Sequence, residues 1–444
     1  MTVTETGAFD ETPDGPTPPG LTAGQRLKAI LGGSAGNLVE WYDWSAYIFF
    51  TVYFASHFFP EGDQTAQLFK AAAVSAVGFL ARPLGAWLMG AYADRAGRRA
   101  ALTLSVAMMC VGSLVIALAP TYSQVGALAP AILLGARILQ GLSVGGEYGA
   151  SATYLSEMAG RERRGFWASF QYVTLIAGSL LAQGLVVVLQ QVMPEADLKA
   201  WGWRIPFFIG AGLAVVVFWI RTGIQESQGF EKAKAAGAER GRTMLLFLKH
   251  PRQTLMVMGL TAGGSLAYYV YTSYMQKFLI NTSGFSKEAA SQIMVLALFC
   301  FMLMQPLFGW LSDKVGRKPL LLFAYGGGMI ATWPILSAIA ATSNIWVAFG
   351  LIMIALTFQS GYSAISGLFK AELFPVHIRA LGVALPYAIA NSVFGGSAEY
   401  VALGFKAAGH ESRFYLYVCG ILAVGLVTVI AMPDTRNTSL INED

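Results

Sequence analysis

Charge, cysteine and histidine are all scarce in this chain of 444 residues. Only 12% of the residues are charged, whereas a soluble globular domain carries about 25%. The three cysteines lie singly in apolar stretches and the four histidines are scattered, with no CxxC pair. Neither a disulfide framework nor a metal centre is therefore expected. The sequence also lacks a phosphate-binding loop and a nucleophile–base pair, so we expect neither an enzyme nor a cofactor.

Apolar residues dominate what is present. They make up 55% of the chain, and the mean hydropathy is +0.55, so most of the surface is expected to face lipid. A helix that crosses a membrane needs about 20 mostly apolar residues, and a barrel strand only about ten. The apolar runs have the helical length, which predicts an all-α integral membrane protein with twelve transmembrane helices. They lie near 28–57, 66–93, 100–119, 127–156, 165–192, 202–221, 253–280, 288–311, 319–341, 345–372, 379–404 and 413–432.

A polar stretch divides these segments into two sets of six. The first residues are rich in Thr, Pro, Gly and acids and have no hydrophobic period, which is typical of disorder. They also lack the pattern of a cleaved signal peptide. The expected divisions are a disordered tail (1–25), a six-helix bundle (26–221), a linker (222–250), a second six-helix bundle (251–433) and a second tail (434–444).

Lysine and arginine concentrate in alternate connections between the segments. Arg95, Arg98 and Arg99 follow the second segment, and Arg163 and Arg164 follow the fourth. The intervening connections carry acids or almost no charge. The positive-inside rule then predicts a bacterial inner-membrane protein with the linker and both termini in the cytoplasm. This topology accounts for the net charge of +5, so no nucleic-acid partner is expected.

The two halves repeat each other. The stretch 90–99, G-A-Y-A-D-R-A-G-R-R, returns at 309–318 as G-W-L-S-D-K-V-G-R-K, and Asp94 recurs 219 residues later as Asp313. Each half also has a glutamate seven residues before an arginine, at Glu157 and at Glu372. Duplicated halves are typical of secondary transporters, which rock one half against the other around a central site.

The repeated loop resembles the signature motif of the major facilitator superfamily. Further stretches resemble its metabolite:proton symporter family, at 36–43, 82–85, 137–149, 168–172, 201–204, 274–277, 370–375 and 395–400. The resemblance spans about residues 26–432 and implies proton-coupled import of a small organic (di)carboxylate, first of all 2-oxoglutarate, by alternating access. It also implies conformational latches that do not touch the substrate. The latch residues are Asp94, Arg98, Glu157, Arg164, Asp313, Arg317, Glu372 and Arg379.

Two arginines lie deep inside apolar segments, where an ionised group costs at least about 2.5–3.5 kcal/mol and therefore marks a functional candidate. We expect Arg82 and Arg137 to bind substrate carboxylates, because a guanidinium stays charged and grips a carboxylate through two parallel hydrogen bonds. Arg137 also matches the superfamily's fourth-span arginine, which implies a part in proton coupling. The alternative is that each arginine is paired permanently with an acid of the same half.

Three acids in the same half are the expected proton carriers: Glu40, Asp43 and Glu147. Protonation of an acid beside a fixed arginine releases the arginine for the substrate. Glu40 and Asp43 lie about 60° apart around a helix and can share a face, whereas Glu147 lies about 80° from the stripe that holds Arg137. Each acid could instead stay ionised as a packing partner. Charge counting against an inside-negative potential predicts at least two protons for each dicarboxylate.

Neutral polar side chains are expected to supply the remaining substrate contacts. They are Tyr42, Gln171, Tyr172, Tyr268, Tyr271, Gln305, Tyr362 and Asn391. Lys277 and Glu399, near the ends of spans seven and eleven, form a candidate periplasmic gate, although a simple interfacial lysine has the same pattern. Lys370, close to a cytoplasmic end, is expected to snorkel towards the interface.

Two other functions fit the sequence. One is a symporter of the same family for shikimate, an aromatic acid, citrate or a betaine. The other is a sensor that binds a metabolite without transporting it, which a large signalling domain would support; only about 12 residues follow the last apolar segment. In each case the expected partners are a small organic acid, protons and the lipid bilayer, and the chain is expected to be a monomer.

Overall fold

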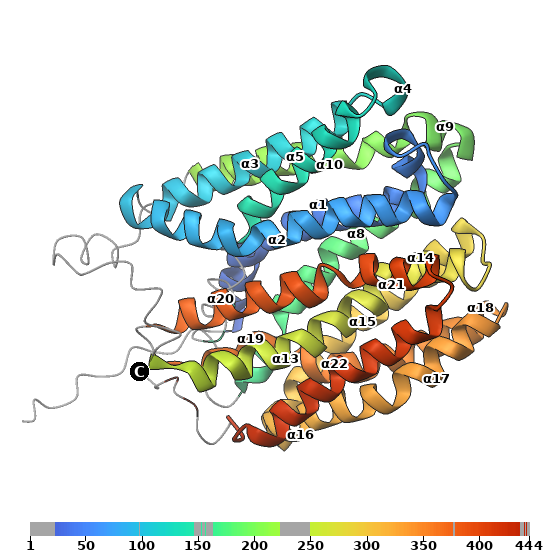
Figure 1. Cartoon of the computed structure of the whole chain (residues 1–444). Coiled ribbons are helices and arrows are strands. Elements are labelled where there is room, and N and C mark those ends of the chain that lie inside the picture. The colour runs from blue at the N-terminus through green and yellow to red at the C-terminus, as the bar shows by residue number, and fades with distance from the viewer. Residues whose placement is uncertain are drawn as a thin grey trace, which may run out of the picture.

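The computed structural model describes residues 23–96, 98–145, 163–222, 249–375 and 378–435, together with Ala152, Ser156, Ser439 and Ile441. Every regular element in these ranges is helical. The helices run side by side along one long axis (Figure 1). The expected N-terminal tail and the linker between the two sets of apolar segments lie almost wholly outside the described residues.

The helices before residue 222 pack mainly on one another. Helix α1 packs on α8 and α10, α2 packs on α5, and α3 packs on α5 and α10. The elements are α1 (Ala23–Phe58), α2 (Gln64–Ala96), α3 (Arg98–Leu118), α4 (Tyr122–Val125), α5 (Leu128–Val144), α7 (Arg164–Ala168), α8 (Phe170–Val192), α9 (Glu195–Ala200), a 3₁₀ turn (Gly202–Arg204) and α10 (Ile205–Thr222).

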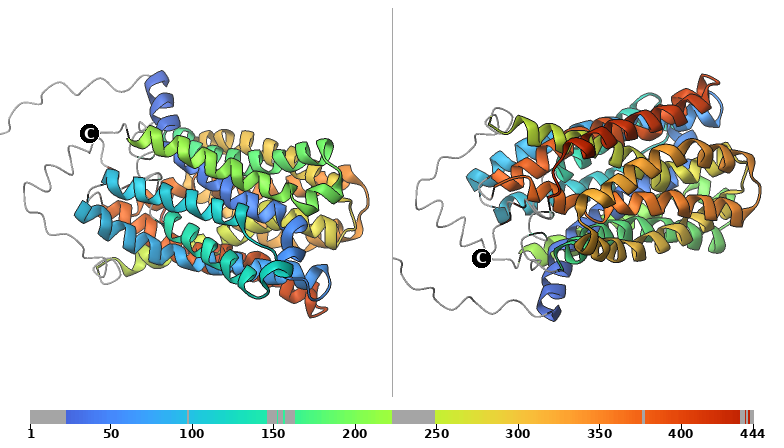
Figure 2. Two further views of the ribbon diagram at one scale, coloured as in Figure 1. Left: turned by 90° about the horizontal axis from the view of Figure 1, so that it is seen from above. Right: turned by 90° about the horizontal axis from the view of Figure 1, so that it is seen from below.

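The helices after residue 250 form the other side of the molecule, as the two views of Figure 2 show. Here α13 packs on α20 and α22, α15 on α18, and α17 on α18 and α22. The elements are α13 (Pro251–Tyr269), α14 (Met275–Asn281), α15 (Lys287–Val315), α16 (Arg317–Leu322), α17 (Gly328–Ala341), α18 (Ile345–Ser363), α19 (Ser366–Glu372), α20 (Arg379–Ala390), α21 (Ala398–Ala407) and α22 (Glu411–Ala431).

Several described helices have the length and composition of membrane spans. They are Gln64–Met89, Arg164–Val192, Lys287–Val315, Arg317–Ala341, Ile345–Glu372 and Glu411–Ala431. Their outward faces carry exposed Leu, Ile, Val and Trp side chains. Apolar side chains are stable on an outer surface that faces lipid, so the fold is that of an integral membrane protein.

Interruptions in the helices after residue 250 mark places where the backbone departs from the regular α-helix. Wide π-helical turns occur at Val270–Tyr274, Phe323–Gly327 and Asn391–Gly395, and helix α18 is separated from α19 by Ala364 and Ile365. Such turns are frequent at functional sites. Two of the expected substrate residues, Tyr271 and Asn391, lie on them.

Close backbone contact between α2 and α5 fixes the position of Arg82. A Cβ on Gly141 would lie 2.0 Å from the carbonyl oxygen of Gly78, and a Cβ on Gly145 would lie 2.1 Å from that of Arg82. Only glycine permits this approach, as the four-residue spacing of small side chains predicts. Gly149, the next glycine at this four-residue spacing, lies outside the described residues.

The two ends of the helices differ in charge. One end, where Gly165 and Phe166 meet Asp313 and Arg317, carries Arg163, Arg164, Arg317 and Lys318 and is called the basic end below. The other, called the opposite end, carries the connections that include Glu61, Asp63 and Glu195. Contacts at these two ends join the helices before residue 222 to those after residue 250.

Candidate functional site

Arg82 lies midway along α2 and is only 5% exposed. The central carbon of its guanidinium lies 4.0 Å from the ring centre of Phe79, 4.1 Å from that of Trp44 and 5.6 Å from that of Trp41. Among the described residues Arg82 forms no ion pair, and its Nε has no hydrogen-bond partner. The alternative of a permanent internal ion pair therefore has no support there.

Side chains from the helices after residue 250 complete the surroundings of Arg82. Tyr269 of α13 stacks on Trp41 with ring centres 6.1 Å apart and meets the edge of Phe79 at 5.2 Å. Its hydroxyl has Arg82 as an electrostatic neighbour. Ser392 donates a hydrogen bond of 2.6 Å to the Phe79 carbonyl oxygen. Arg82 therefore lies where the two sets of helices meet.

Several polar atoms around this meeting point are buried without a hydrogen-bond partner. They are Nε of Arg82, the hydroxyls of Tyr268 and Tyr269, and both amide atoms of Asn391. Each unsatisfied buried polar atom costs about 1–3 kcal/mol, so such a group needs an explanation. A guanidinium, two phenols and an amide are together suited to bind an anion that brings its own hydrogen-bond acceptors. We call Arg82, Tyr268, Tyr269 and Asn391 the central cluster.

A second polar group links Arg137 to Asp43 through Gln140. Arg137 is fully buried and donates a hydrogen bond of 2.9 Å to Oε1 of Gln140, whose Nε2 donates one of 2.6 Å to Asp43. Ser113 also donates to Asp43. The acid and the arginine are therefore linked through the amide of Gln140, and their part in proton coupling stays a prediction.

Trp44 connects the second polar group to the central cluster. Its ring centre lies 3.6 Å from the guanidinium carbon of Arg137 and 4.1 Å from that of Arg82. A change in the position of either guanidinium therefore acts on the ring that the other contacts. Glu40 is buried on α1 and is an electrostatic neighbour of the Tyr269 hydroxyl, whereas Glu147 lies outside the described residues.

The other expected substrate residues divide into two groups. Tyr172 lies beside the central cluster, since its ring centre is 5.8 Å from that of Tyr268. Tyr42, Tyr271 and Gln305 instead have partners inside their own set of helices. Their partners are the Pro206 carbonyl at 3.0 Å, the Thr332 hydroxyl at 3.0 Å, and Ser363 with the Phe301 carbonyl at 2.8 and 2.9 Å. Their role as substrate ligands stays a prediction.

The position of Lys370 shows that the expectation of a snorkelling side chain was wrong. It is fully buried on α19 and does not snorkel, because the break between α18 and α19 and the packing of neighbouring helices enclose it. Its Nζ donates hydrogen bonds to Ser366 at 2.8 Å and to the expected substrate residue Tyr362 at 3.3 Å. Gln171 lies close by, on the facing surface of α8, where a Cβ on Gly367 would be 2.3 Å from its Oε1.

The expected latch residues are in contact at the basic end. Asp313 accepts hydrogen bonds of 2.7 and 2.9 Å from the backbone N–H groups of Gly165 and Phe166, which belong to the other set of helices. Arg317 donates to Asp313 at 3.1 Å and to Glu372 at 3.4 Å. The two bonds to Asp313 from the backbone of Gly165 and Phe166 join α15 to α7, so opening this end requires that they break.

The remaining latch residues are described only in part. Arg164 donates to Ser439 at 3.5 Å, and Nε of Arg379 donates to the Phe374 carbonyl at 3.2 Å. The side chains of Asp94 and Arg98 lie outside the described part of the structure, as does Glu157. Their latch role stays a prediction.

Lys277 and Glu399 form the expected ion pair towards the opposite end. The Lys277 Nζ lies 2.6 Å from Oε1 of Glu399, and the two side chains are 1% and 14% exposed. The pair joins α14 to α21, both of which come after residue 250. It therefore braces one set of helices and does not itself bridge the two sets.

Replacing Lys277 with methionine should lower the free energy of unfolding by about 3–5 kcal/mol, because it leaves the Glu399 carboxylate buried without its cation. The double variant Lys277→Met/Glu399→Met should recover much of this loss. Thermal unfolding of the purified protein in detergent measures both effects. Equal destabilisation by the single and double variants would contradict the pairing.

A different ion pair bridges the two sets of helices at the opposite end. Lys287 of α15 contacts Glu195 of α9 at 2.6 Å and lies 5.1 Å from the ring centre of Tyr53 on α1. Lys199 also contacts Glu195, at 2.9 Å. The two lysines lower the pKa of Glu195 from 4.5 to about 2. Stabilisation by this pair is therefore complete above the ordinary pKa and is lost only as pH falls through about 2.

Glu195→Gln should therefore leave the shape of the pH profile of transport unchanged, since Glu195 stays ionised across the working range. The side chain is half exposed, so the stability change should stay below about 1 kcal/mol. Initial uptake rates between about pH 5 and about pH 8 test this. A shift of the acidic limb in the variant would show that Glu195 takes part in proton coupling.

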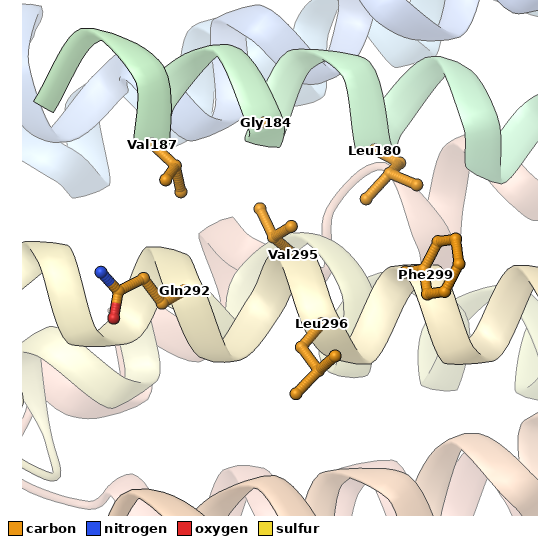
Figure 3. A pocket seen from close by; sticks show the side chains of 7 residues that line it. All are labelled: Leu180, Gly184, Val187, Gln292, Val295, Leu296 and Phe299. Carbon is orange, nitrogen blue, oxygen red and sulfur yellow. The ribbon is translucent and has the colours of Figure 1, made fainter. Parts of the chain in front are cut away.

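A cavity of about 390 Å³ lies apart from the central cluster, between α8 and α15 (Figure 3). Leu180, Gly184 and Val187 line it from α8, and Gln292, Val295, Leu296 and Phe299 line it from α15. Leu296 and Phe299 are also exposed on the outer surface. A mostly apolar lining beside exposed apolar side chains suits a lipid chain. Its described lining residues include no cationic side chain that could bind a carboxylate, so we do not assign the substrate to this cavity.

Sequence reasoning missed the aromatic frame of the central cluster, formed by Trp41, Trp44, Phe79 and Tyr269. Tyr269 and Gln140 are not among the residues that the sequence analysis singles out. Tryptophan and phenylalanine in an apolar segment more often face lipid or pack, so their types give no signal. Their spacing does give a signal, because Trp41 directly follows Glu40, and Trp41 and Trp44 lie on either side of Asp43 in the sequence.

Comparison with known proteins places these features in a family. The model of the Major Facilitator Superfamily matches residues 33–399. The alpha-ketoglutarate permease of Escherichia coli is 53% identical over 92% of this chain and 94% of its own length. The citrate-proton symporter of Klebsiella pneumoniae is 30% identical over 90% and 91%. The xylose transporter of E. coli, in a partially occluded inward-open conformation, matches in fold with a TM-score of 0.74 at 19% identity, over 93% of this chain and 99% of that one.

Proposed function

The chain belongs to the major facilitator superfamily, and on this premise we propose that it is a proton-coupled symporter that imports 2-oxoglutarate by alternating access. It is a transporter and not an enzyme, as its relatives are named permeases and symporters. The identity of 53% to an alpha-ketoglutarate permease over nearly the whole of both chains supports the substrate. The citrate-proton symporter among its relatives supports coupling to protons.

The single structural observation that carries the proposal is the central cluster. A buried arginine without an ion pair in the described structure faces two phenols and an amide whose polar atoms have no partner. A carboxylate would satisfy the donors among these groups at once, because it offers acceptors to the guanidinium, to both hydroxyls and to the amide N–H groups of Asn391. The cluster also lies where the two sets of helices meet, which is where a rocking transporter must hold its substrate.

The proposed architecture has twelve transmembrane helices in two pseudo-symmetric six-helix bundles, residues 26–221 and 251–433, joined by a cytoplasmic linker. The basic end faces the cytoplasm, and both termini lie there. The excess of arginine and lysine at that end supports this orientation. The protein works as a monomer in the bacterial inner membrane, with one substrate path between its halves.

Proton coupling runs through Asp43 and Arg137. When Asp43 takes a proton, its hold on Gln140 weakens, and Gln140 is the side chain that also holds Arg137. Arg137 can then move against Trp44, which touches Arg82 on its other side. The state of the acid thereby changes the position of the arginine that binds substrate. Glu40 and Glu147 are the remaining candidates for a second proton.

Two sets of bonds act as gates. The bonds from Asp313 to Gly165 and Phe166 close the cytoplasmic end, and the Lys287–Glu195 pair closes the periplasmic end. Both are made in the structure and Arg82 is buried, which supports the proposal that this conformation corresponds to an occluded state. Import requires the periplasmic contacts to break first and the cytoplasmic contacts second.

Substrate counterflow tests the proposal. Proteoliposomes loaded with unlabelled 2-oxoglutarate should take up labelled 2-oxoglutarate, and external citrate, shikimate or betaine should compete at least about tenfold less well. If one of these solutes competes more strongly, that solute is the substrate, and the protein is a symporter of the same family with a different specificity. Binding of 2-oxoglutarate without any counterflow would identify a sensor, the alternative that contradicts transport.

A further inference from the structure

The buried amine of Lys370 is a polar feature that the proposed mechanism leaves without a task. It lies near the cytoplasmic end of α19, one turn beyond the break at Ala364–Ile365. An ammonium group inside a membrane protein is costly, and such groups usually mark a substrate or ion pathway. Asp43, Arg137 and the latch residues already account for coupling and gating, so Lys370 calls for a role of its own.

The described contacts of the Lys370 amine include hydroxyl groups and aromatic rings. Nζ donates to Ser366 at 2.8 Å and to Tyr362 at 3.3 Å, and it lies 4.3 Å from the ring centre of Tyr387. An ammonium has three protons to donate, and a hydroxyl that accepts one of them can donate its own proton onward. Lys370 and Tyr362 can therefore bind the same carboxylate.

The face of α19 that carries Lys370 is turned towards the other half of the molecule. Gly367, three residues earlier, lies on the same face. A Cβ on Gly367 would be 2.3 Å from Oε1 of Gln171 and 3.1 Å from Cβ of Ala152, both of which belong to the helices before residue 222. Gly367 thus lies on the surface where the halves meet, and the Lys370 amine lies beside Tyr362 and Ser366 within one turn of it.

The spacing along α13 between Gly264, on which Tyr362 packs, and Tyr269 of the central cluster suits a short dicarboxylate. The ring of Tyr362 packs on Gly264, where a Cβ would be 2.3 Å from its Cζ. Gly264 lies five residues before Tyr269 on α13, which is about 7.5 Å along the helix. The terminal carbons of an extended five-carbon diacid are about 5 Å apart, so its two carboxylates can reach towards Tyr269 and Tyr362.

We infer that Lys370 binds the second carboxylate of the substrate, opposite Arg82. This inference rests on the proposed function and specifies its chemistry: the ligand is a dicarboxylate that spans the two halves. Arg82 holds one carboxylate from the first half, and Lys370 with Tyr362 holds the other from the second. A monocarboxylate of the same length fills only one of these positions and does not draw the halves together.

Equilibrium binding to the purified full-length protein tests the inference. The probes are 2-oxoglutarate and 2-oxopentanoate, which has the same five-carbon chain without the second carboxylate. In the Lys370→Met variant the affinity for 2-oxoglutarate should fall about 10- to 100-fold, while that for 2-oxopentanoate changes less than about threefold. Lys406→Met, a lysine of the same half that is hydrogen-bonded to Thr282 at the opposite end, should alter neither.

The outcomes separate the inference from the proposed function. An unchanged preference for the dicarboxylate in Lys370→Met overturns the inference, and so does an equal loss for both probes, which indicates a structural role. Lys370→Gln, which is polar and uncharged, gives the same readout if the methionine variant does not fold. Wild-type protein that binds neither probe contradicts the proposed substrate itself.

Discussion

The Arg82→Met variant should lose at least about 100-fold of its uptake of 2-oxoglutarate, measured as initial rate at a substrate concentration well below KM. A bidentate guanidinium–carboxylate contact contains two charge-assisted hydrogen bonds worth about 1.5–3 kcal/mol each. Losing both costs at least about 3 kcal/mol, which is about a hundredfold in affinity. Methionine keeps most of the side-chain volume among Trp41, Trp44 and Phe79, so the loss reports binding and not collapse of the aromatic frame.

A conservative variant and a control variant accompany this experiment. Arg82→Lys keeps the charge but not the two parallel bonds, so its loss should be intermediate. Arg413→Met removes an exposed arginine at the opposite end and should leave uptake within about twofold of wild type. If Arg82→Met binds and transports 2-oxoglutarate as wild type does, the central cluster is not the substrate site.

The Asp43→Asn variant should exchange substrate across the membrane while failing to accumulate it. Asparagine has the shape of the protonated acid and keeps an acceptor for Ser113 or Gln140, but it carries no proton through the cycle. Counterflow should therefore stay within about threefold of wild type. Accumulation driven by a proton gradient should fall at least about tenfold, as expected when one coupling group is removed.

The exposed acid Asp63 provides the matched control for that experiment. It caps the start of α2 by accepting from the N–H of Ala66 at 2.8 Å, and asparagine can do the same. Asp63→Asn should therefore both exchange and accumulate like wild type. Normal accumulation by Asp43→Asn would show that the coupling proton is carried elsewhere, with Glu40 and Glu147 as the next candidates.

The sequence was sufficient to single out the buried ionisable side chains of the candidate site. Arg82, Arg137 and Asp43 stood out because an ionisable side chain in a membrane segment is rare and costly. The duplicated loop around Asp94 and Asp313 likewise predicted contacts between the halves, and the structure places Asp313 in such a contact.

The sequence does not show which side of each helix faces the other half of the molecule. Tyr42, Tyr271 and Gln305 are polar residues in the expected segments, yet each faces the interior of its own set of helices. In a helix with apolar side chains all round, no polar face indicates which side meets the other half. Hydrogen bonds to carbonyl and hydroxyl groups satisfy these residues locally, which composition alone does not reveal.

Lys370 was misplaced for a related reason. Its position near the end of an apolar segment favoured an extended side chain at the interface. The interruption of the helix at Ala364–Ile365 and the close approach of Gly367 to Gln171 and Ala152 enclose it instead. Both features depend on tertiary contacts between segments about 200 residues apart, which no local pattern encodes.

Uptake of labelled 2-oxoglutarate into proteoliposomes with an imposed inward proton gradient tests the central claim most directly. The proposal predicts accumulation above the external concentration that collapses when a proton carrier is added. With at least two protons for each dianion, an inside-negative potential should not slow this uptake, since no net negative charge enters. Uptake that only equilibrates, or that ignores the proton gradient, would contradict proton-coupled symport.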